Sequence, residues 1–129
     1  MSAKILIADD EPNILISLEY LMKREGFEVH LARDGNEALA LLQRERPQLV
    51  LLDVMMPHKS GFEVCQALRA DEALRDTLVL MLTAKGRETD VAKGLGVGAD
   101  AYMTKPFATK DLVAKVRELL AGASAAPAA

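Results

Sequence analysis

The chain has 129 residues, of which 50% are hydrophobic and 27% charged, and its formal net charge is −3. This length suffices for one domain whose core needs neither a disulfide nor a structural metal. The single cysteine, Cys65, excludes an internal disulfide, and the slight acidity disfavours direct binding to nucleic acid. Neither a signal peptide nor a stretch long enough to span a membrane is visible, so we expect a cytoplasmic protein without membrane contact.

Five short apolar runs alternate with segments of helical spacing. The runs cover residues 5–8, 27–31, 49–52, 78–82 and 99–103, and the helical segments lie around 14–22, 37–42, 62–70, 87–93 and 112–120. Strands that alternate with helices of this length predict right-handed βαβ crossovers and a parallel sheet.

Local signals set boundaries within this pattern. Pro12 suits the first turn of a helix, where its missing N–H costs little. Asp34 and Glu37 have the spacing of a helix N-cap and its reciprocal partner. Residues 122–129 are only Gly, Ala, Ser and Pro, so we predict one domain over residues 1–121 and a disordered tail or linker after it.

The apolar runs differ in a way that predicts the strand order. Runs 5–8, 49–52 and 78–82 are almost wholly apolar, as expected for strands covered by helices on both faces. Runs 27–31 and 99–103 alternate between apolar and polar residues, which suits the edges of a sheet. We therefore predict a flavodoxin-like, doubly wound α/β fold with five parallel strands in the order 2-1-3-4-5 and five helices.

Reactive side chains stand where the apolar runs end. Asp9, Asp10 and Glu11 follow the first run, Asp53 the third, Thr83 the fourth and Lys105 the fifth. Ligands of open parallel sheets bind beyond the carboxyl ends of the strands, where the strand order reverses. We therefore expect these side chains to meet at one edge of the sheet.

The chemistry of this set indicates a phosphoryl-binding site. Carboxylates gathered at one point repel one another unless a cation joins them, and an all-oxygen set favours Mg²⁺. The metal and Lys105 would neutralise charge on phosphoryl oxygens, and Thr83 would donate a hydrogen bond to one of them. An aspartate carboxylate can itself act as the nucleophile and form an acyl phosphate.

Four motifs carry a resemblance to a known family. They are ILIADDE at 5–11, LLDVMMP at 51–57 with Gly61, LTA at 82–84, and GADAYMTKPF at 98–107. With them the chain resembles the response-regulator receiver domains of two-component signalling, in particular the chemotaxis regulators, over about residues 3–121.

The resemblance implies a magnesium-dependent phosphoacceptor rather than an enzyme. Asp53 would accept a phosphoryl group from a phosphohistidine on a sensor histidine kinase or a phosphotransfer protein. Asp10, Asp53 and the backbone carbonyl of Met55 would hold Mg²⁺, and Asp9 would act mainly through water.

The resemblance also implies which residues respond to the phosphoryl group. Lys105 would bind it, Thr83 would follow it, and Tyr102 would be the aromatic switch that changes a surface read by an unknown downstream protein. A cis bond between Lys105 and Pro106 is expected. The domain would be a monomer or a phosphorylation-dependent dimer, and it could stand alone, act in a phosphorelay or be cut from a longer regulator.

Two functions from other classes are less consistent with the residues. A phosphatase or phosphotransferase of the haloacid-dehalogenase type needs an acidic residue two positions after its nucleophile, where this chain has Met55. A flavodoxin-like flavin carrier needs a hydroxyl-rich phosphate loop after the first strand, where this chain has three acidic residues.

The remaining features have simpler interpretations. The glycines at 94–98 fit a helix end and a turn rather than a dinucleotide-binding loop. His30 and His58 have no His or Cys partner at metal-binding spacing, so we interpret both as surface residues. Cys65 is interpreted as a small packed side chain.

Overall fold

The computed structural model describes residues 3–84, 96 and 98–125. The elements are β1 (Lys4–Ala8), α1 (Pro12–Arg24), β2 (Glu28–Ala32), α2 (Gly35–Glu45), β3 (Leu49–Asp53), α3 (Gly61–Ala70), β4 (Leu78–Ala84), β5 (Ala101–Lys105) and α5 (Thr109–Ala125). The strands form one parallel sheet in the order β2-β1-β3-β4-β5. This confirms the predicted order and both edge strands. The predicted helix over residues 87–93 lies outside the described residues, which contain the other four predicted helices.

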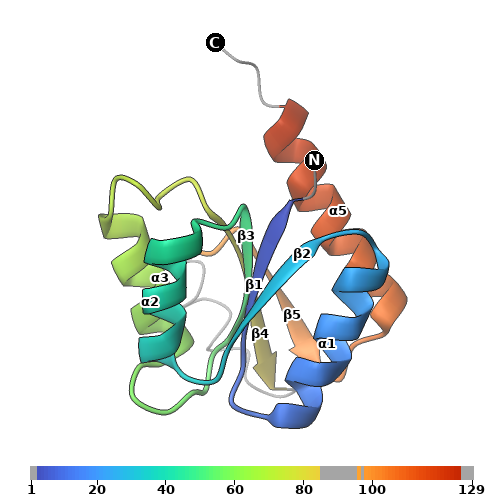
Figure 1. Cartoon of the computed structure of the whole chain (residues 1–129), viewed down its shortest axis with the longest axis horizontal. Coiled ribbons are helices and arrows are strands. Elements are labelled where there is room, and N and C mark those ends of the chain that lie inside the picture. The colour runs from blue at the N-terminus through green and yellow to red at the C-terminus, as the bar shows by residue number, and fades with distance from the viewer. Residues whose placement is uncertain (1–2, 85–95, 97, 126–129) are drawn as a thin grey trace.

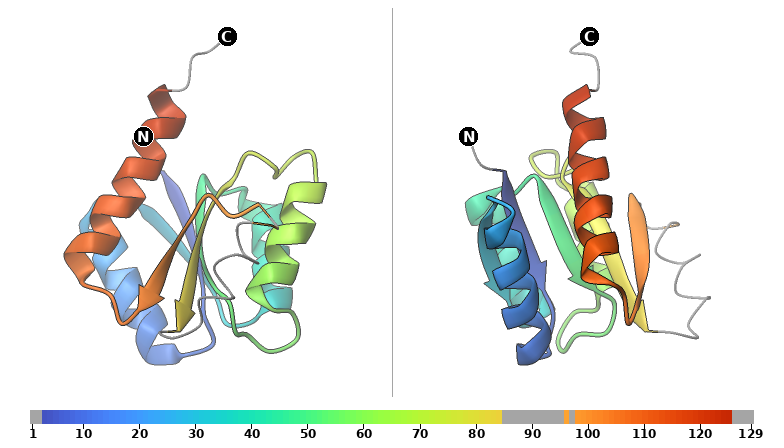
Figure 2. Two further views of the ribbon diagram at one scale, coloured as in Figure 1. Left: turned by 180° about the vertical axis from the view of Figure 1, so that it is seen from behind. Right: turned by 90° about the vertical axis from the view of Figure 1, so that its right-hand side faces the viewer.

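The helices form a layer on each face of the sheet. Helices α1 and α5 cover one face, and α2 and α3 cover the other (Figure 1). The views from behind and from the side show the same three layers (Figure 2). All five residues of β3 are buried, whereas β5 alternates between half-buried and exposed residues. The apolar runs and the alternating runs of the sequence thus correspond to central and edge strands.

Two separate cores follow from the two-residue period of the strands. On β1, Ile5 and Ile7 belong to the core beneath α1 and α5, and Leu6 belongs to the core beneath α2 and α3. On β3, Leu51 and Leu52 divide in the same way. Because successive side chains of a strand point to opposite faces, each strand end presents its polar residues to a defined face.

The N-terminal caps of the helices agree only in part with those predicted from the sequence. The Asp34 carboxylate accepts a hydrogen bond from the backbone N–H of Glu37 at 2.8 Å, as predicted. The Glu37 carboxylate accepts instead from the backbone N–H of Arg33 at 3.2 Å, so the predicted reciprocal bond to Asp34 is replaced by one to its neighbour. A complete capping box occurs at α3, where Ser60 and Glu63 bond each other's backbone N–H groups.

Helix α5 extends to Ala125, four residues into the segment predicted as a tail. Residues 126–129 lie outside the described part of the chain, so the domain boundary at residue 121 stays a prediction. None of the helices among the described residues is both long and apolar enough to cross a membrane.

The start of β5 is held by Arg69 of α3. Its guanidinium donates to the backbone carbonyls of Gly98, Arg75 and Thr77 at 2.9, 2.6 and 2.6 Å. It also pairs with the Asp100 carboxylate at 2.7 Å. Gly98 has a φ of 103°, a left-handed conformation that favours glycine. This agrees with the turn expected there, while residues 94, 95 and 97 lie outside the described part of the chain.

Candidate functional site

Three carboxylates meet at the carboxyl end of the sheet. Asp9 follows β1 and is fully buried, and Asp53, the last residue of β3, is 6% exposed. Asp10 is exposed. One carboxylate oxygen from each of these residues lies within 4.8 Å of the others.

Lys105 completes the cluster from the edge strand. It is the last residue of β5, and its ammonium donates to Asp9 Oδ2 at 2.8 Å and to Asp53 Oδ1 at 3.3 Å. Its nitrogen lies 3.9 Å from a carboxylate oxygen of Glu11. The peptide bond between Lys105 and Pro106 is cis, as expected.

The strand register explains why these side chains share one face. Ile7 pairs with Leu51 in the core beneath α1 and α5, and Asp9 and Asp53 each stand two residues further along their strands. Met103 packs against the same core, and Lys105 stands two residues beyond it. Each polar residue therefore continues an inward-facing apolar column, which is why it is largely buried.

Burial and charge set the protonation of this cluster. Burial raises the pKa of Asp53 to about 7, the charge of Asp9 adds to the rise, and Lys105 opposes it. Burial lowers the pKa of Lys105, but its bond to Asp9 and the charges of Asp53 and Asp9 outweigh that effect and raise the pKa overall. Lys105 therefore stays protonated. The negative charge of the carboxylates around it is larger than the single positive charge with which it can neutralise them.

The donor set fits a hard divalent cation. Asp9, Asp10 and Asp53 contribute only oxygen atoms, which Mg²⁺ prefers, and Mg²⁺ needs only one or two carboxylates in addition to water and phosphate oxygens. Burial and the charge of Asp9 raise the pKa of Asp53, and such an ion would offset both effects. Met55, two residues after Asp53, has an exposed side chain, and its predicted role through the backbone carbonyl stays a proposal.

Thr83 and Tyr102 face the side of the sheet opposite to this cluster, and Thr83 directly follows Leu82, the register partner of Asp53. Thr83 is 2% exposed and pairs with Thr104 in the register of β4 and β5. Tyr102 stands two residues before Thr104 on the same face of the edge strand and is 39% exposed. Thr83 and Tyr102 are thus diagonal neighbours on one face of the paired strands β4 and β5.

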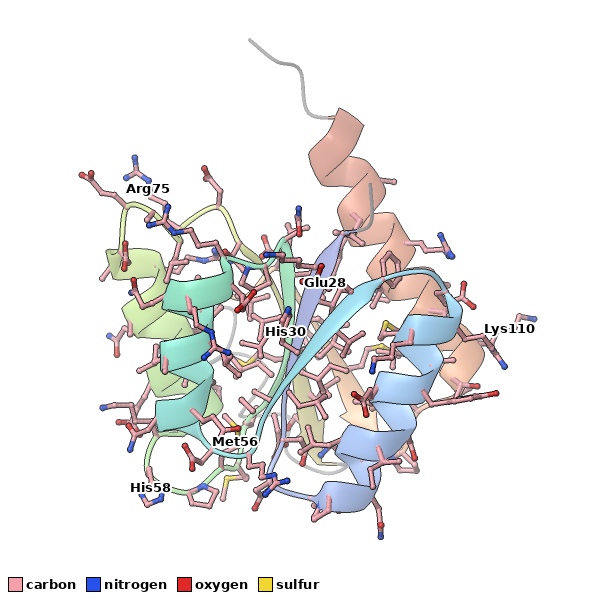
Figure 3. All side chains as sticks on the ribbon, viewed as in Figure 1. Glu28, His30, Met56, His58, Arg75 and Lys110 are labelled. Carbon is pink, nitrogen blue, oxygen red and sulfur yellow. The ribbon has the colours of Figure 1, made fainter. Side chains whose placement is uncertain are left out.

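The loop after β3 fixes the backbone of Asp53. The N–H of Gly61, the first residue of α3, donates to the Val54 carbonyl at 2.9 Å. A Cβ atom on Gly61 would overlap the carbonyl oxygen of Asp53. Met56 and His58 lie in this loop, at the lower end of the molecule in Figure 3, and His58 is exposed as predicted.

We expect Gly61→Ala to destabilise the domain and reduce any chemistry at Asp53, because the added methyl group forces the Asp53 carbonyl to move. A strained insertion of this kind costs about 1–3 kcal/mol of unfolding free energy. Gly122→Ala is the matched control, since a Cβ there meets no atom within 4 Å. Urea denaturation should show a loss for Gly61→Ala and none for Gly122→Ala; equal stabilities would contradict the close approach.

The same loop also contacts α2, which little in the sequence indicates. The N–H of Gly35 donates to the Pro57 carbonyl at 3.4 Å, and a Cβ atom on Gly35 would overlap the Lys59 carbonyl oxygen. A glycine directly after the N-cap Asp34 is the one sequence feature that could have suggested this close approach.

Comparison with known proteins identifies the family. Residues 5–117 match the response regulator receiver domain family. The chemotaxis response regulator CheY4 of Vibrio cholerae is 34% identical and has a TM-score of 0.87, over 92% of this chain and 99% of that one. The receiver domain of a signal transduction histidine kinase from Syntrophus aciditrophicus is 32% identical, with a TM-score of 0.89 over 99% and 97% of the two chains. A BeF₃-activated DrrB receiver domain is 34% identical, with a TM-score of 0.85 over 94% and 99%.

The chain belongs to the response regulator receiver domains, the signalling domains of two-component systems. The resemblance inferred from the four motifs is thereby confirmed.

Proposed function

We propose that this domain is a phosphoacceptor switch that takes a phosphoryl group onto Asp53 from a phosphohistidine. The donor would be a sensor histidine kinase or a phosphotransfer protein. The observation that supports this most strongly is the meeting of Asp9, Asp10, Asp53 and Lys105 at the carboxyl end of the sheet. Asp53 is the last residue of β3, the middle strand of the five.

The proposed reaction is a direct displacement at phosphorus. A carboxylate oxygen of Asp53 forms a bond to phosphorus, while the bond from phosphorus to the donor's imidazole nitrogen breaks and leaves its electron pair on that nitrogen. Lys105, already in contact with Asp53, would pair with a phosphoryl oxygen. Asp10, Asp53 and the Met55 carbonyl would hold Mg²⁺, and Asp9 would act mainly through water. The ion, when bound, would supply positive charge to the reacting oxygens.

The output would be a change around Thr83 and Tyr102. The phosphoryl group carries about −1.5 to −2 charges, in place of the single charge of the Asp53 carboxylate. We propose that the Thr83 hydroxyl moves to donate to a phosphoryl oxygen and that the Tyr102 ring turns into the space that Thr83 leaves. A downstream protein, or a second phosphorylated copy, would read the changed surface on β5.

Removing the Thr83 hydroxyl should separate phosphorylation from this output. One hydrogen bond to a charged group contributes about 1.5–3 kcal/mol, whereas shifting a population from 1:99 to 99:1 needs about 5.5 kcal/mol. Thr83→Ala should therefore weaken the response of the Tyr102 ring, measured by NMR on adding beryllofluoride and Mg²⁺, and leave labelling of Asp53 largely intact. A full Tyr102 response in Thr83→Ala would contradict the coupling.

Labelling of the wild-type chain should require a divalent ion. Incubation with acetyl phosphate and Mg²⁺ should add one phosphoryl group, seen in the intact mass, and the label should fall at least roughly tenfold in EDTA because the carboxylates lose their counter-ion. Readdition of Mg²⁺ to the same sample is the control. Equal labelling in EDTA would exclude the proposed metal dependence.

A further inference from the structure

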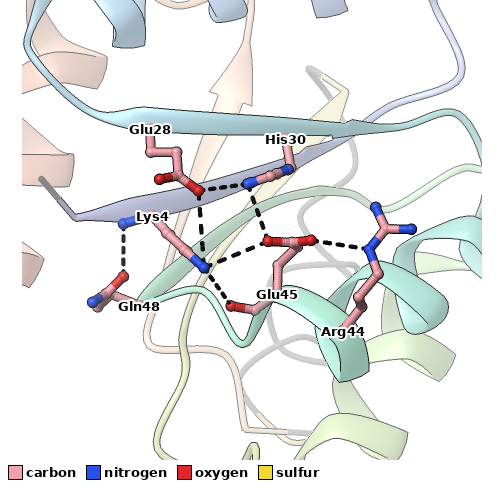
Figure 4. Close-up of polar contacts among 6 residues, drawn as sticks. All are labelled: Lys4, Glu28, His30, Arg44, Glu45 and Gln48. Atoms are coloured by element: carbon pink, nitrogen blue, oxygen red, sulfur yellow. Dashed lines mark hydrogen bonds and ion pairs between the residues drawn. The ribbon is translucent and has the colours of Figure 1, made fainter.

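A second group of metal-ligating side chains lies away from Asp53, at the start of the sheet's edge strand. Glu28 and His30 are two residues apart on β2, so both point to the same face. Glu45, the last residue of α2, and Lys4, the first residue of β1, meet them there (Figure 4). The sequence interpretation of His30 as a surface residue rests on its having no His or Cys partner; its partners are glutamates, and its side chain is only 25% exposed.

The donor atoms of this group are close together. His30 Nε2 lies 2.8 Å from Glu28 Oε2 and 3.5 Å from Glu45 Oε1. All three atoms lie within 4.8 Å of one another. Tetrahedral Zn²⁺ with bonds of about 2.0–2.1 Å separates its ligands by about 3.3 Å. Small side-chain rotations would therefore bring the three atoms to ligand spacing.

The ammonium group of Lys4 already pairs with the same two carboxylates. The Lys4 ammonium lies 3.9 Å from Glu28 Oε2 and 3.4 Å from Glu45 Oε1, the two oxygens that face His30. The Lys4 side chain is 36% exposed, so it can rotate out into solvent when a metal ion binds. The other oxygen of Glu45 accepts from Arg44 Nε at 2.9 Å, which lowers the pKa of Glu45 and so favours its ionised carboxylate.

We propose that His30, Glu28 and Glu45 form a second metal site, selective for Zn²⁺ or a similar imidazole-binding ion, in which the metal displaces the Lys4 ammonium. Water would fill the fourth position, which the partial exposure of the cluster allows. The imidazole nitrogen separates this site from the all-oxygen cluster at Asp53, since imidazole suits Zn²⁺, Cu²⁺ and Ni²⁺ whereas Mg²⁺ prefers oxygen. The bound ion would tie the edge strand β2 to the end of α2.

The test is Zn²⁺ binding by isothermal titration calorimetry, with saturating Mg²⁺ present to occupy the carboxylates at Asp53. Co²⁺ absorption would report a tetrahedral site with a nitrogen ligand. His30→Gln should weaken Zn²⁺ binding at least roughly tenfold and remove the Co²⁺ bands. His58→Gln is the matched control, because His58 is exposed in a different part of the molecule (Figure 3). Circular dichroism of each variant checks that the fold is kept.

Lys4→Met gives an independent readout, because it removes the competing ammonium and leaves the three ligands in place. It should strengthen Zn²⁺ binding, and Zn²⁺ should then raise the melting temperature of Lys4→Met more than that of the wild type. The proposal is overturned if the wild type binds no Zn²⁺, or if His30→Gln and His58→Gln bind it as tightly as the wild type. It is also overturned if Lys4→Met weakens binding.

Discussion

Asp53→Asn is expected to be more stable than the wild-type domain in metal-free buffer at pH 8, although it removes the residue that the proposed function needs most. Burial and the charge of Asp9 disfavour a second negative charge at this position, and the amide of the variant would carry none. The gain in unfolding free energy should be on the order of 1–4 kcal/mol, because one pKa unit corresponds to about 1.4 kcal/mol.

The gain should depend on pH in a definite direction. The pKa of Asp53 is raised from 3.8 to about 7, so between these values the folded state holds a proton that the unfolded state has released. The wild type therefore loses stability relative to Asp53→Asn as the pH rises from about 4 to about 7, and the difference is constant above that range. Urea denaturation of both proteins at several pH values measures it.

Two further measurements make this prediction specific. Asp76→Asn is the control, because Asp76 is exposed. Saturating Mg²⁺ should reduce or reverse the advantage of Asp53→Asn, since ligand at about 100 times its dissociation constant stabilises the wild type by about 2.7 kcal/mol. A wild type that is as stable as Asp53→Asn at pH 8 without metal would contradict the inferred cost of a charged carboxylate at this buried position beside Asp9.

Lys105→Met should have the opposite effect. It removes the ammonium that bonds Asp9 and Asp53, and Asp9 is fully buried. An unpaired buried carboxylate costs several kcal/mol, so we expect a loss of about 2–4 kcal/mol in metal-free buffer at pH 8. Acidification should recover part of that loss, because protonation removes the uncompensated charge.

Lys110→Met is the matched control for Lys105→Met. Lys110 stands on α5 with its side chain directed away from the molecule (Figure 3). Mg²⁺ should stabilise Lys105→Met more than the wild type, because it replaces the missing cation. Comparable losses in the two lysine variants, or no greater effect of Mg²⁺ on Lys105→Met, would contradict the role assigned to Lys105.

Much of the sheet could be predicted because its strands differ in burial. Apolar and alternating runs distinguish central from edge strands, and together with the strand order typical of flavodoxin-like folds this distinction predicts the order 2-1-3-4-5. The gathering of Asp9, Asp53 and Lys105 was predictable for the same reason, since parallel strands bring their carboxyl ends to one edge.

Contacts between distant segments could not be predicted from spacing. The bonds of Arg69 to the start of β5 join residues about thirty positions apart, and nothing local distinguishes Arg69 from other helical arginines. His30 contacts Glu45 only because the last residue of α2 lies next to β2 in the folded chain. The Glu37 bond to Arg33 shows that even a local cap depends on a choice between two adjacent N–H groups.

The most direct test of the central claim is to find which carboxylate carries the phosphoryl group. The domain is treated with acetyl phosphate and Mg²⁺ and then with borohydride, which reduces an acyl phosphate to an alcohol and turns the labelled aspartate into homoserine. Peptide mass spectrometry should find homoserine at position 53, with Asp9 and Asp10 unchanged and no homoserine in Asp53→Asn. Homoserine at another aspartate, or a phosphoryl group that survives borohydride on a different side chain, would contradict the assignment of Asp53.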